Sequence, residues 1–301
     1  MITARSVGAA AALSAAAALS YMGFESQWVR RVEFTVGVAD LHPDLEGLTI
    51  AHLSDPHAGF RPSFNMRAAR IAFDLAMAAQ PDLIAVTGDL AGGEANLDGI
   101  KDLLATLHAP LGVYAVLGNH DHGRSKAPFT RAVDFSDLGD YGVRLLSNET
   151  VTVPRGAARV QVCGVDDVKH GFGDLRPVLE RLDRDPATLR LLLSHYAEGA
   201  LMAAAASFHL TLSGDTHGGQ ICVPWFGGPV MFSQPRAQFK DGLYDRDGRV
   251  IHVTRGIGTS LLPFRLLCRP EAAVIRLVRA PAGDTPSRST RVGALRPAAW
   301  Y

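Results

Sequence analysis

The chain has 301 residues, 47% of them hydrophobic and 20% charged, and this ordinary globular composition excludes a fibrous or wholly disordered protein. Thirty Lys and Arg residues balance thirty Asp and Glu residues, so no net charge draws the protein to nucleic acid, and we expect no nucleic-acid partner. Three cysteines far apart, with no CxxC pair, exclude a disulfide scaffold.

The first predicted element is an apolar helix near the start of the chain. Ser6 to Phe24 is nineteen residues long and carries no charge, with one arginine before it and two close behind it. That length is just enough to cross a bilayer. Three interpretations stay open for residues 1–29: a signal anchor, a cleaved export signal, or an alanine-rich helix that leads the domain. We therefore expect a membrane-anchored or exported protein, with the bacterial inner membrane favoured and the side of the membrane left open.

Apolar runs and amphipathic stretches alternate in the first half of the chain. The apolar runs predict strands at Leu48–Leu53, Leu83–Val86 and Val113–Leu117. The amphipathic stretches predict helices at Phe64–Met77, Leu97–Leu107 and Phe129–Leu138. This alternation is typical of βαβ units.

The same pattern returns after a strand-rich middle. It predicts strands at Leu189–Leu193 and Leu210–Leu212, and a helix at Glu198–Ala206. No repeat or linker interrupts this part of the chain, so we expect one domain over residues 30–279. Residues 280–301 are rich in Pro, Gly, Ser and Arg without a sustained period, which predicts a disordered tail.

Side chains that bind metals follow five of the predicted strands. They are Asp55 and His57, then Asp89, then Asn119 with His120 and Asp121, then His195, and finally Asp215 with His217. A single such pair is more often a turn or a helix cap than a ligand. In open α/β sheets, however, ligands bind beyond the carboxyl ends of the strands, so these five loops can converge on one site.

The order of these motifs resembles the signature of the calcineurin-like metallophosphoesterases. The matching motifs are Asp55-x-His57, Gly88-Asp89, Gly118-Asn119-His120-Asp121, His195 and Gly214-x-x-His217. The stretches Leu111–Asp121, Thr216–Gln220 and Arg255–Ser260 further resemble the bacterial, often membrane-anchored branch of that family. The resemblance implies an α/β (α+β) fold, a four-layer αββα sandwich of two mixed β-sheets flanked by helices.

By this resemblance the chain is a metallophosphoesterase, a hydrolase of phosphate monoesters, diesters or pyrophosphates with a dinuclear metal site and a bridging hydroxide. The implied ligands are Asp55, His57 and His217 for the first metal, Asp89 as the bridge, and Asn119, His195 and Asp215 for the second. His120 would donate a proton to the leaving oxygen or stabilise charge on the phosphoryl group, and Asp121 would orient His120. Two divalent ions are implied, of Mn, Fe, Zn or Mg, with Mn favoured.

The chain departs from the family at one implied ligand. The usual Gly-His-x-His is here Gly214-Asp215-Thr216-His217, so a carboxylate replaces an imidazole. This replacement predicts a second metal site that prefers a harder, more exchangeable ion such as Mn or Mg, or a second site that binds weakly.

The residues that would contact substrate are less well specified. His122, Arg255 and Arg265 are the candidates, with ordinary surface or salt-bridging roles as the alternative. Two other functions stay open besides phosphoester hydrolysis in general. One is a membrane-lipid pyrophosphatase acting on a UDP-diacylglucosamine-like substrate, and the other is a decayed metal- or phosphate-binding protein, because Asp215 replaces histidine. The sequence does not give the physiological substrate or the oligomeric state.

Overall fold

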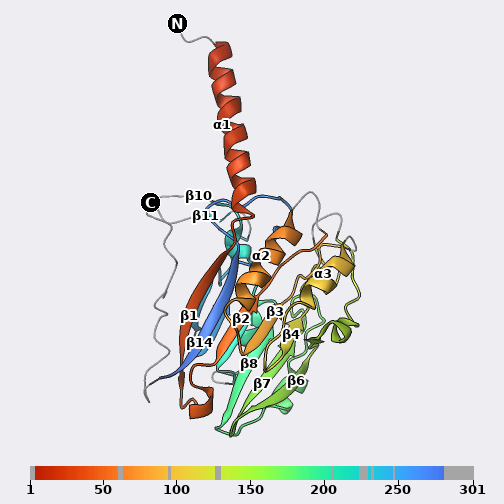
Figure 1. The fold of residues 1–301 in the computed structure, drawn as a ribbon, viewed down its shortest axis with the longest axis vertical. Helices are drawn as coiled ribbons and strands as arrows, with labels where there is room; N and C mark the ends of the chain where they lie inside the picture. The colour runs from red at the N-terminus through yellow and green to blue at the C-terminus, as the bar shows by residue number, and fades with distance from the viewer. Residues whose placement is uncertain are drawn as a thin grey trace.

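Two β-sheets face each other, and helices cover both outer faces (Figure 1). The computed structural model describes residues 4–59, 64–93, 96–125, 130–204, 207–223, 230–231, 234–246 and 248–280. The predicted tail lies outside the described residues except for Ala280, which ends the last strand. The predicted four-layer αββα sandwich is confirmed.

The first sheet has six strands, most of them parallel. Their order is β1 (Arg30–Ala39), β14 (Glu271–Ala280), β2 (Thr49–Leu53), β3 (Leu83–Thr87), β4 (Val113–Val116) and β5 (Val143–Leu145). β2 to β5 are parallel, whereas β14 pairs with β2 in the antiparallel sense. The carboxyl ends of β2, β3 and β4 therefore meet at one edge of this sheet.

The second sheet also has six strands. Their order is β12 (Gly242–Arg246), β13 (Arg249–Val253), β9 (Leu210–Ser213), β8 (Thr188–Ser194), β7 (Ala158–Val165) and β6 (Glu149–Arg155). The four central strands are parallel, and an antiparallel partner closes each side. A separate two-stranded ribbon pairs β10 (Cys222–Val223) with β11 (Val230–Met231).

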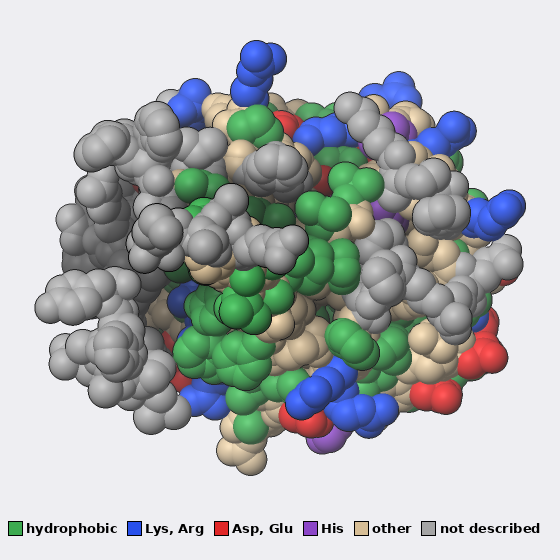
Figure 2. Space-filling view, turned by 90° about the horizontal axis from the view of Figure 1, so that it is seen from above, with side chains coloured by type: hydrophobic (Ala, Val, Ile, Leu, Met, Phe, Trp, Pro, Cys, Tyr) green, Lys and Arg blue, Asp and Glu red, His purple; other side chains and the backbone are tan. Residues whose placement is uncertain are grey.

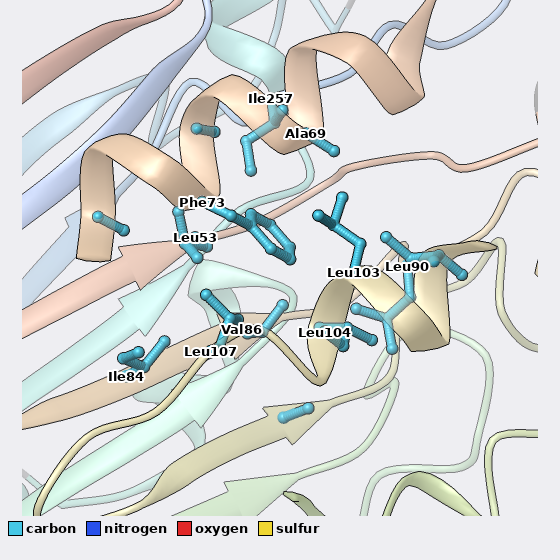
Figure 3. Close-up of a cluster of buried hydrophobic side chains, with 14 of the residues drawn as sticks. Leu53, Ala69, Phe73, Ile84, Val86, Leu90, Leu103, Leu104, Leu107 and Ile257 are labelled. Atoms are coloured by element: carbon cyan, nitrogen blue, oxygen red, sulfur yellow. The ribbon is translucent and has the colours of Figure 1, made fainter. Parts of the chain in front are cut away.

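Successive side chains of a strand point to opposite faces of the sheet, so each central strand contributes to two layers of the core. In β3, Leu83 and Ala85 pack between the two sheets, whereas Ile84 and Val86 face the helices α2 (Asn65–Met77) and α3 (Leu97–Leu104). Figure 3 shows this outer cluster, with Phe73 of α2 and Leu104 of α3 lying over Ile84 and Val86. On the far side, α4 (Arg176–Glu180) and the 3₁₀ helix η3 (Ala197–Met202) cover the second sheet. Three further 3₁₀ turns are η1 (Pro43–Leu45), η2 (Leu138–Tyr141) and η4 (His217–Gly219).

Two predicted helices are wrong. Residues 130–137 are not helical, because the Asp134 side chain accepts the Ser136 N–H at 2.8 Å and so competes with helix formation. Only η2 forms at the end of that stretch. In place of the predicted helix Glu198–Ala206, the residues Ala197–Met202 form a 3₁₀ helix, packed so closely that a Cβ on Gly199 would collide with Ser194. Residues 205–206 of the predicted helix lie outside the described residues.

The helix α1 (Ala4–Glu25) contains the predicted apolar helix and projects from one end of the sandwich (Figure 1). Within it, Ser6–Glu25 has a mean hydropathy of 1.5 in its most apolar window, and none of that window is buried. The segment is long and apolar enough to cross a membrane, although a signal sequence has the same properties.

Candidate metal centre

The five predicted loops converge at one end of the sandwich. They follow the carboxyl ends of β2, β3 and β4 in the first sheet and of β8 and β9 in the second. Among the described residues they form three overlapping groups of potential metal ligands: Asp55 with His57 and His217, His57 with Asp89 and His120, and Asp55 with Asp89 and His195. The convergence expected from the strand ends is therefore present.

The backbone at these loops is strained. Five of the predicted ligands have a positive φ, namely Asp55, His57, Asp89, Asp215 and His217, with φ between 45° and 70°. Each such residue costs roughly 1 to 3 kcal/mol, and strain of this kind gathers at functional sites. Two glycines make the close approach possible, because a Cβ on Gly118 would collide with Asp89 and a Cβ on Gly214 with Asp55.

The first group, Asp55 with His57 and His217, brings three buried potential ligand atoms close together. The Nε2 atoms of His57 and His217 lie 3.0 Å apart, and Asp55 Oδ1 lies 3.5 Å from the Nε2 of His217 and 4.0 Å from that of His57. All three residues are buried, and Asp55 Oδ1 has no hydrogen-bond partner among the described residues. An unpaired buried carboxylate oxygen beside two imidazoles fits a divalent cation.

Asp89 lies between the first group and His195. Its Oδ2 is 3.4 Å from His57 Nε2 and 3.5 Å from His195 Nε2. Its Oδ1 accepts the backbone N–H of His120 at 2.8 Å, which fixes the carboxylate. His195 Nδ1 lies 2.8 Å from the carbonyl of Thr87 and must donate to it, so Nε2 presents a lone pair that no described group satisfies. A carboxylate so placed can bridge two cations.

His120 and Asp121 contact different groups. The His120 ring packs edge-on against His57, with centroids 4.5 Å apart, and Thr130 Oγ1 lies 3.3 Å from His120 Nδ1. The Asp121 carboxylate accepts the backbone N–H groups of Gly118 at 2.9 Å and of Ala91 at 3.0 Å. These contacts are with the backbone and not with the imidazole, and the orientation of His120 by Asp121 stays a prediction. Asp121 ties the loop after β3 to the loop after β4 and so positions His120 through the backbone.

Asp215 lies at the edge of the centre. Its Oδ1 is 3.9 Å from His195 Nε2, and its backbone N–H donates to Asp55 Oδ2 at 3.3 Å. Its other oxygen, Oδ2, is 3.7 Å from the ammonium of Lys169. Lys169 also lies 3.3 Å from a carboxylate oxygen of Glu198 and 3.9 Å from the centroid of the Tyr196 ring. The extra negative charge at this position thus has a cationic partner nearby.

Asn119 is held by a residue that the sequence analysis missed. Its Oδ1 accepts the Tyr196 hydroxyl at 2.8 Å, and its Nδ2 donates to the carbonyl of Arg124 at 2.8 Å. These two bonds determine which amide atom of Asn119 is the oxygen. The Tyr196 ring also packs against the His195 ring, so Oδ1 of Asn119 lies on the same side of the centre as His195. Tyr196 directly follows His195 in the chain, and this position could have identified it as a residue of the site. No sequence pattern pointed to Lys169.

The three candidate substrate residues are engaged elsewhere. Arg255 donates to Asp241 through Nε and a terminal nitrogen, both at 2.7 Å, which is the salt-bridging alternative. Arg265 is fully buried and donates to the carbonyls of Gly258 and Arg255, so its predicted contact with substrate is wrong. One of its terminal nitrogens lies 3.3 Å from His217 Nδ1, beneath the metal pocket.

His122 forms a pair with Asp166. Its Nε2 lies 2.6 Å from Asp166 Oδ1, and its ring stacks on Phe172 with centroids 3.9 Å apart. Burial acts to lower the pKa of His122, but the hydrogen bond and charge of Asp166 outweigh burial and raise that pKa. For Asp166, burial acts to raise the pKa, but its hydrogen bonds from His122 and Ser147 lower it overall. The pair therefore stabilises the fold while both groups are charged.

We expect Asp166→Asn to lower the free energy of unfolding by about 1 kcal/mol at pH 5.5, since a partly exposed pair is screened by solvent. The stability from His122 is complete below its unfolded pKa, about 6.5, and disappears as the pH rises through its raised folded pKa. The stability from Asp166, whose pKa is lowered, is complete above its unfolded pKa of about 3.9, and so it is the same at pH 5.5 and at pH 9. Urea unfolding at pH 5.5 and pH 9 should give a smaller difference at pH 9. Asp174→Asn, which breaks an exposed pair with Arg176, is the control and should show no such change with pH.

The electrostatics of the centre favour cations. Burial raises the pKa of Asp55 to about 7, with Asp89 and Asp215 adding to the shift against the opposing effect of His195. Burial, together with the neighbouring His120, lowers the pKa of His57 to about 3. The raised pKa of Asp55 reflects burial and crowded negative charge, which a divalent cation would relieve, and the lowered pKa of His57 leaves its imidazole uncharged, as a metal ligand must be. Burial acts to lower the pKa of His195, but the neighbouring carboxylates raise it overall, so a cation would displace a proton from that ring. The residues present therefore fit divalent cations.

Comparisons with known proteins give a consistent result. Residues 48–226 match the family model described as calcineurin-like phosphoesterase. The Bacillus subtilis protein "Uncharacterized metallophosphoesterase YkuE" is 29% identical over 89% of this chain and 93% of its own length. The Escherichia coli "Phosphodiesterase YaeI" is 30% identical over 69% of this chain and 74% of its own length. The Chlamydia trachomatis "UDP-2,3-diacylglucosamine pyrophosphatase LpxG" is 24% identical over 79% of this chain and 85% of its own length.

Proposed function

The chain belongs to the calcineurin-like phosphoesterase family and is a phosphoester hydrolase, and from that premise we propose that it cleaves its substrates with two divalent cations bound at the converging loops. The observation that carries the proposal is the set of buried, converging lone pairs, of which Asp55 Oδ1 and His195 Nε2 have no hydrogen-bond partner among the described residues. The proposed ligands are Asp55, His57, Asp89, Asn119, His195, Asp215 and His217. We favour Mn or Mg over Zn beside Asp215, because a carboxylate replaces an imidazole there.

The protein side of the mechanism follows from the geometry. Bound divalent cations supply Lewis-acid activation of water and neutralise charge on the phosphoryl group. Asp89 Oδ1 holds the His120 backbone N–H, and Asp121 holds the loops on either side, so the imidazole of His120 stays beside the cluster. From that position His120 donates a proton to the leaving oxygen. Thr130 Oγ1 near Nδ1 restricts how the ring turns.

The direct test uses the full chain purified in detergent. Elemental analysis gives its metal content, and hydrolysis of p-nitrophenyl phosphate and of bis(p-nitrophenyl) phosphate is followed with added Mn, Mg or Zn. We expect two cations per chain, turnover that a chelator abolishes, and a preference between the two esters. A chain with neither bound metal nor turnover would contradict the proposal and favour the decayed binding protein.

We expect His120→Gln to lower kcat about 10²- to 10⁴-fold while metal content stays unchanged, because a positioned acid contributes about that much. The loss should be larger for an alkyl phosphate than for a p-nitrophenyl ester, whose leaving group needs less protonation. His108→Gln changes an exposed histidine after α3 and is the matched control. An equal loss on both kinds of ester would assign His120 a charge-stabilising role instead.

A membrane-lipid pyrophosphate is the second candidate substrate. The observation that favours it is α1, an unburied apolar helix at one end of the sandwich, and the Chlamydia relative is named for such a substrate. Cleavage of the pyrophosphate in UDP-2,3-diacylglucosamine releases UMP, which can be measured directly. UMP release well above the rate for UDP-glucose would support this candidate. Equal rates for both substrates would remove the acyl chains from recognition.

A further inference from the structure

The last turn of α1 is bound to the domain by several contacts. The backbone N–H of Arg265 donates to the carbonyl of Met22 at 3.1 Å, and that of Cys268 donates to the buried Glu25 carboxylate at 2.6 Å. The Arg269 guanidinium lies 3.7 Å from the centroid of the Trp28 ring and donates to the Trp28 carbonyl at 2.9 Å. Only four residues separate the end of α1 from the start of β1. The helix is therefore not a freely jointed appendage.

The same segment of chain contacts the loop that carries a metal-ligand candidate. Leu266 accepts the backbone N–H of Cys222 at 2.9 Å and donates its own to Gln220 at 3.0 Å. The Arg265 side chain reaches His217 Nδ1 at 3.3 Å. Residues 261–268 thus lie between α1 and the loop of His217, so α1 leaves the domain at the end where the metal centre lies.

Large apolar side chains are exposed along this segment. We call them the apolar rim, which comprises Phe24, Trp28, Val223, Leu261, Leu262 and Leu267. Leu261 and Leu267 are 59% and 54% exposed, and both have a positive φ, which is a genuine outlier for a bulky residue. Figure 2 views this end of the molecule along α1, with hydrophobic side chains in the middle and Lys and Arg side chains mostly toward the margin. An exposed apolar patch on a strained loop is typical of an interaction surface.

We propose that the apolar rim lies in the interfacial layer of the lipid bilayer that α1 enters, so that the metal-centre end of the domain faces the membrane. The twenty-residue apolar stretch of α1 is about 30 Å long as a helix, which matches the hydrocarbon thickness of a bilayer. When it spans the bilayer, its last turn lies at the boundary, and its contacts with residues 265–269 bring the rim to the same depth. Trp28 stacked on Arg269 is the kind of pair found at that boundary.

The orientation of the domain at the membrane does not depend on the proposed hydrolysis. Lipid is the expected occupant of the rim because the rim is continuous with α1. A second copy of the chain is the competing occupant, and the test must separate the two.

The experiment places a fluorophore at the rim of the full chain. Leu261→Cys and Leu267→Cys are labelled with an environment-sensitive dye, and Cys163, Cys222 and Cys268 are buried, so the introduced thiol reacts selectively. Arg184→Cys lies before β8, at the opposite end of the sandwich, and is the matched exposed control. Each labelled chain is reconstituted in lipid nanodiscs that hold one copy and contain lipids with a quenching group on the acyl chain.

We expect the two rim labels to be quenched at least about three-fold more strongly than the label at position 184. Equal quenching at all three positions, or none at the rim, would overturn the proposal. Blue-shifted rim emission that appears in discs holding two copies but not in discs holding one would show that a second chain covers the rim, and would overturn it as well. Leu262→Cys provides a further rim position if one of the labelled variants does not fold.

Discussion

Asp89→Asn is expected to lower kcat/KM for phosphoester hydrolysis at least about 10³-fold, because it weakens the binding of both proposed cations. Several kcal/mol of transition-state stabilisation come from bound cations, and each 1.36 kcal/mol is a factor of ten in rate. Asp89 Oδ2 lies 3.4 Å from His57 Nε2 and 3.5 Å from His195 Nε2, whereas Oδ1 accepts the His120 N–H. In the variant the amide oxygen keeps the bond to His120, so the NH₂ group points at the cations and repels them.

The fold should survive this substitution. Asn tolerates the positive φ of 50° at this position, and the amide is the same size as the carboxylate. Elemental analysis should show metal content falling from two cations per chain to one or fewer. Asp102→Asn, at an exposed position of α3, controls for the loss of one negative charge. Full metal content with less than a ten-fold loss of activity would contradict a bridging role for Asp89.

The convergence of the candidate ligands was predictable because of where they stand in the chain. Each follows an apolar run directly, and parallel strands bring their carboxyl ends to one edge. Asp55 after β2 and His195 after β8 come from different sheets, and yet both lie against Asp89. Here the local sequence and the overall topology agree, so the sequence pattern was sufficient to predict that these ligand candidates converge.

Other parts of the site depend on packing that no local pattern encodes. Arg265 stands 48 positions after His217, and its burial beneath that residue results from how residues 261–268 fold against α1. Asp121 follows His120 in the chain, but its carboxylate is directed at two backbone N–H groups from different loops. The sequence therefore shows that an arginine or an aspartate lies near a metal motif, but it does not show which group that side chain contacts.

Asp215→His is expected to shift the metal preference of the proposed second site towards Zn, with zinc affinity rising at least about 10-fold. An imidazole restores a nitrogen ligand where the family usually has one, and zinc favours nitrogen over an added carboxylate. Histidine also tolerates the positive φ of 70° at this position. The measurement is zinc and manganese titration of the metal-free chain, together with activity under each ion.

Lys169 also contacts the Asp215 carboxylate, so the role of Asp215 has to be tested against this ion pair. The Lys169 ammonium lies 3.7 Å from Asp215 Oδ2, whereas Asp215 Oδ1 lies 3.9 Å from His195 Nε2. If Asp215 is a ligand, Asp215→Asn should weaken the second site, and Lys169→Met should strengthen it by freeing the carboxylate. If Asp215 serves only to pair with Lys169, then Asp215→His and Asp215→Asn should leave both metal affinities unchanged. The Asp215 variants therefore separate a metal ligand from a salt-bridge partner, and Lys169→Met tests whether the lysine draws the carboxylate away from the cation.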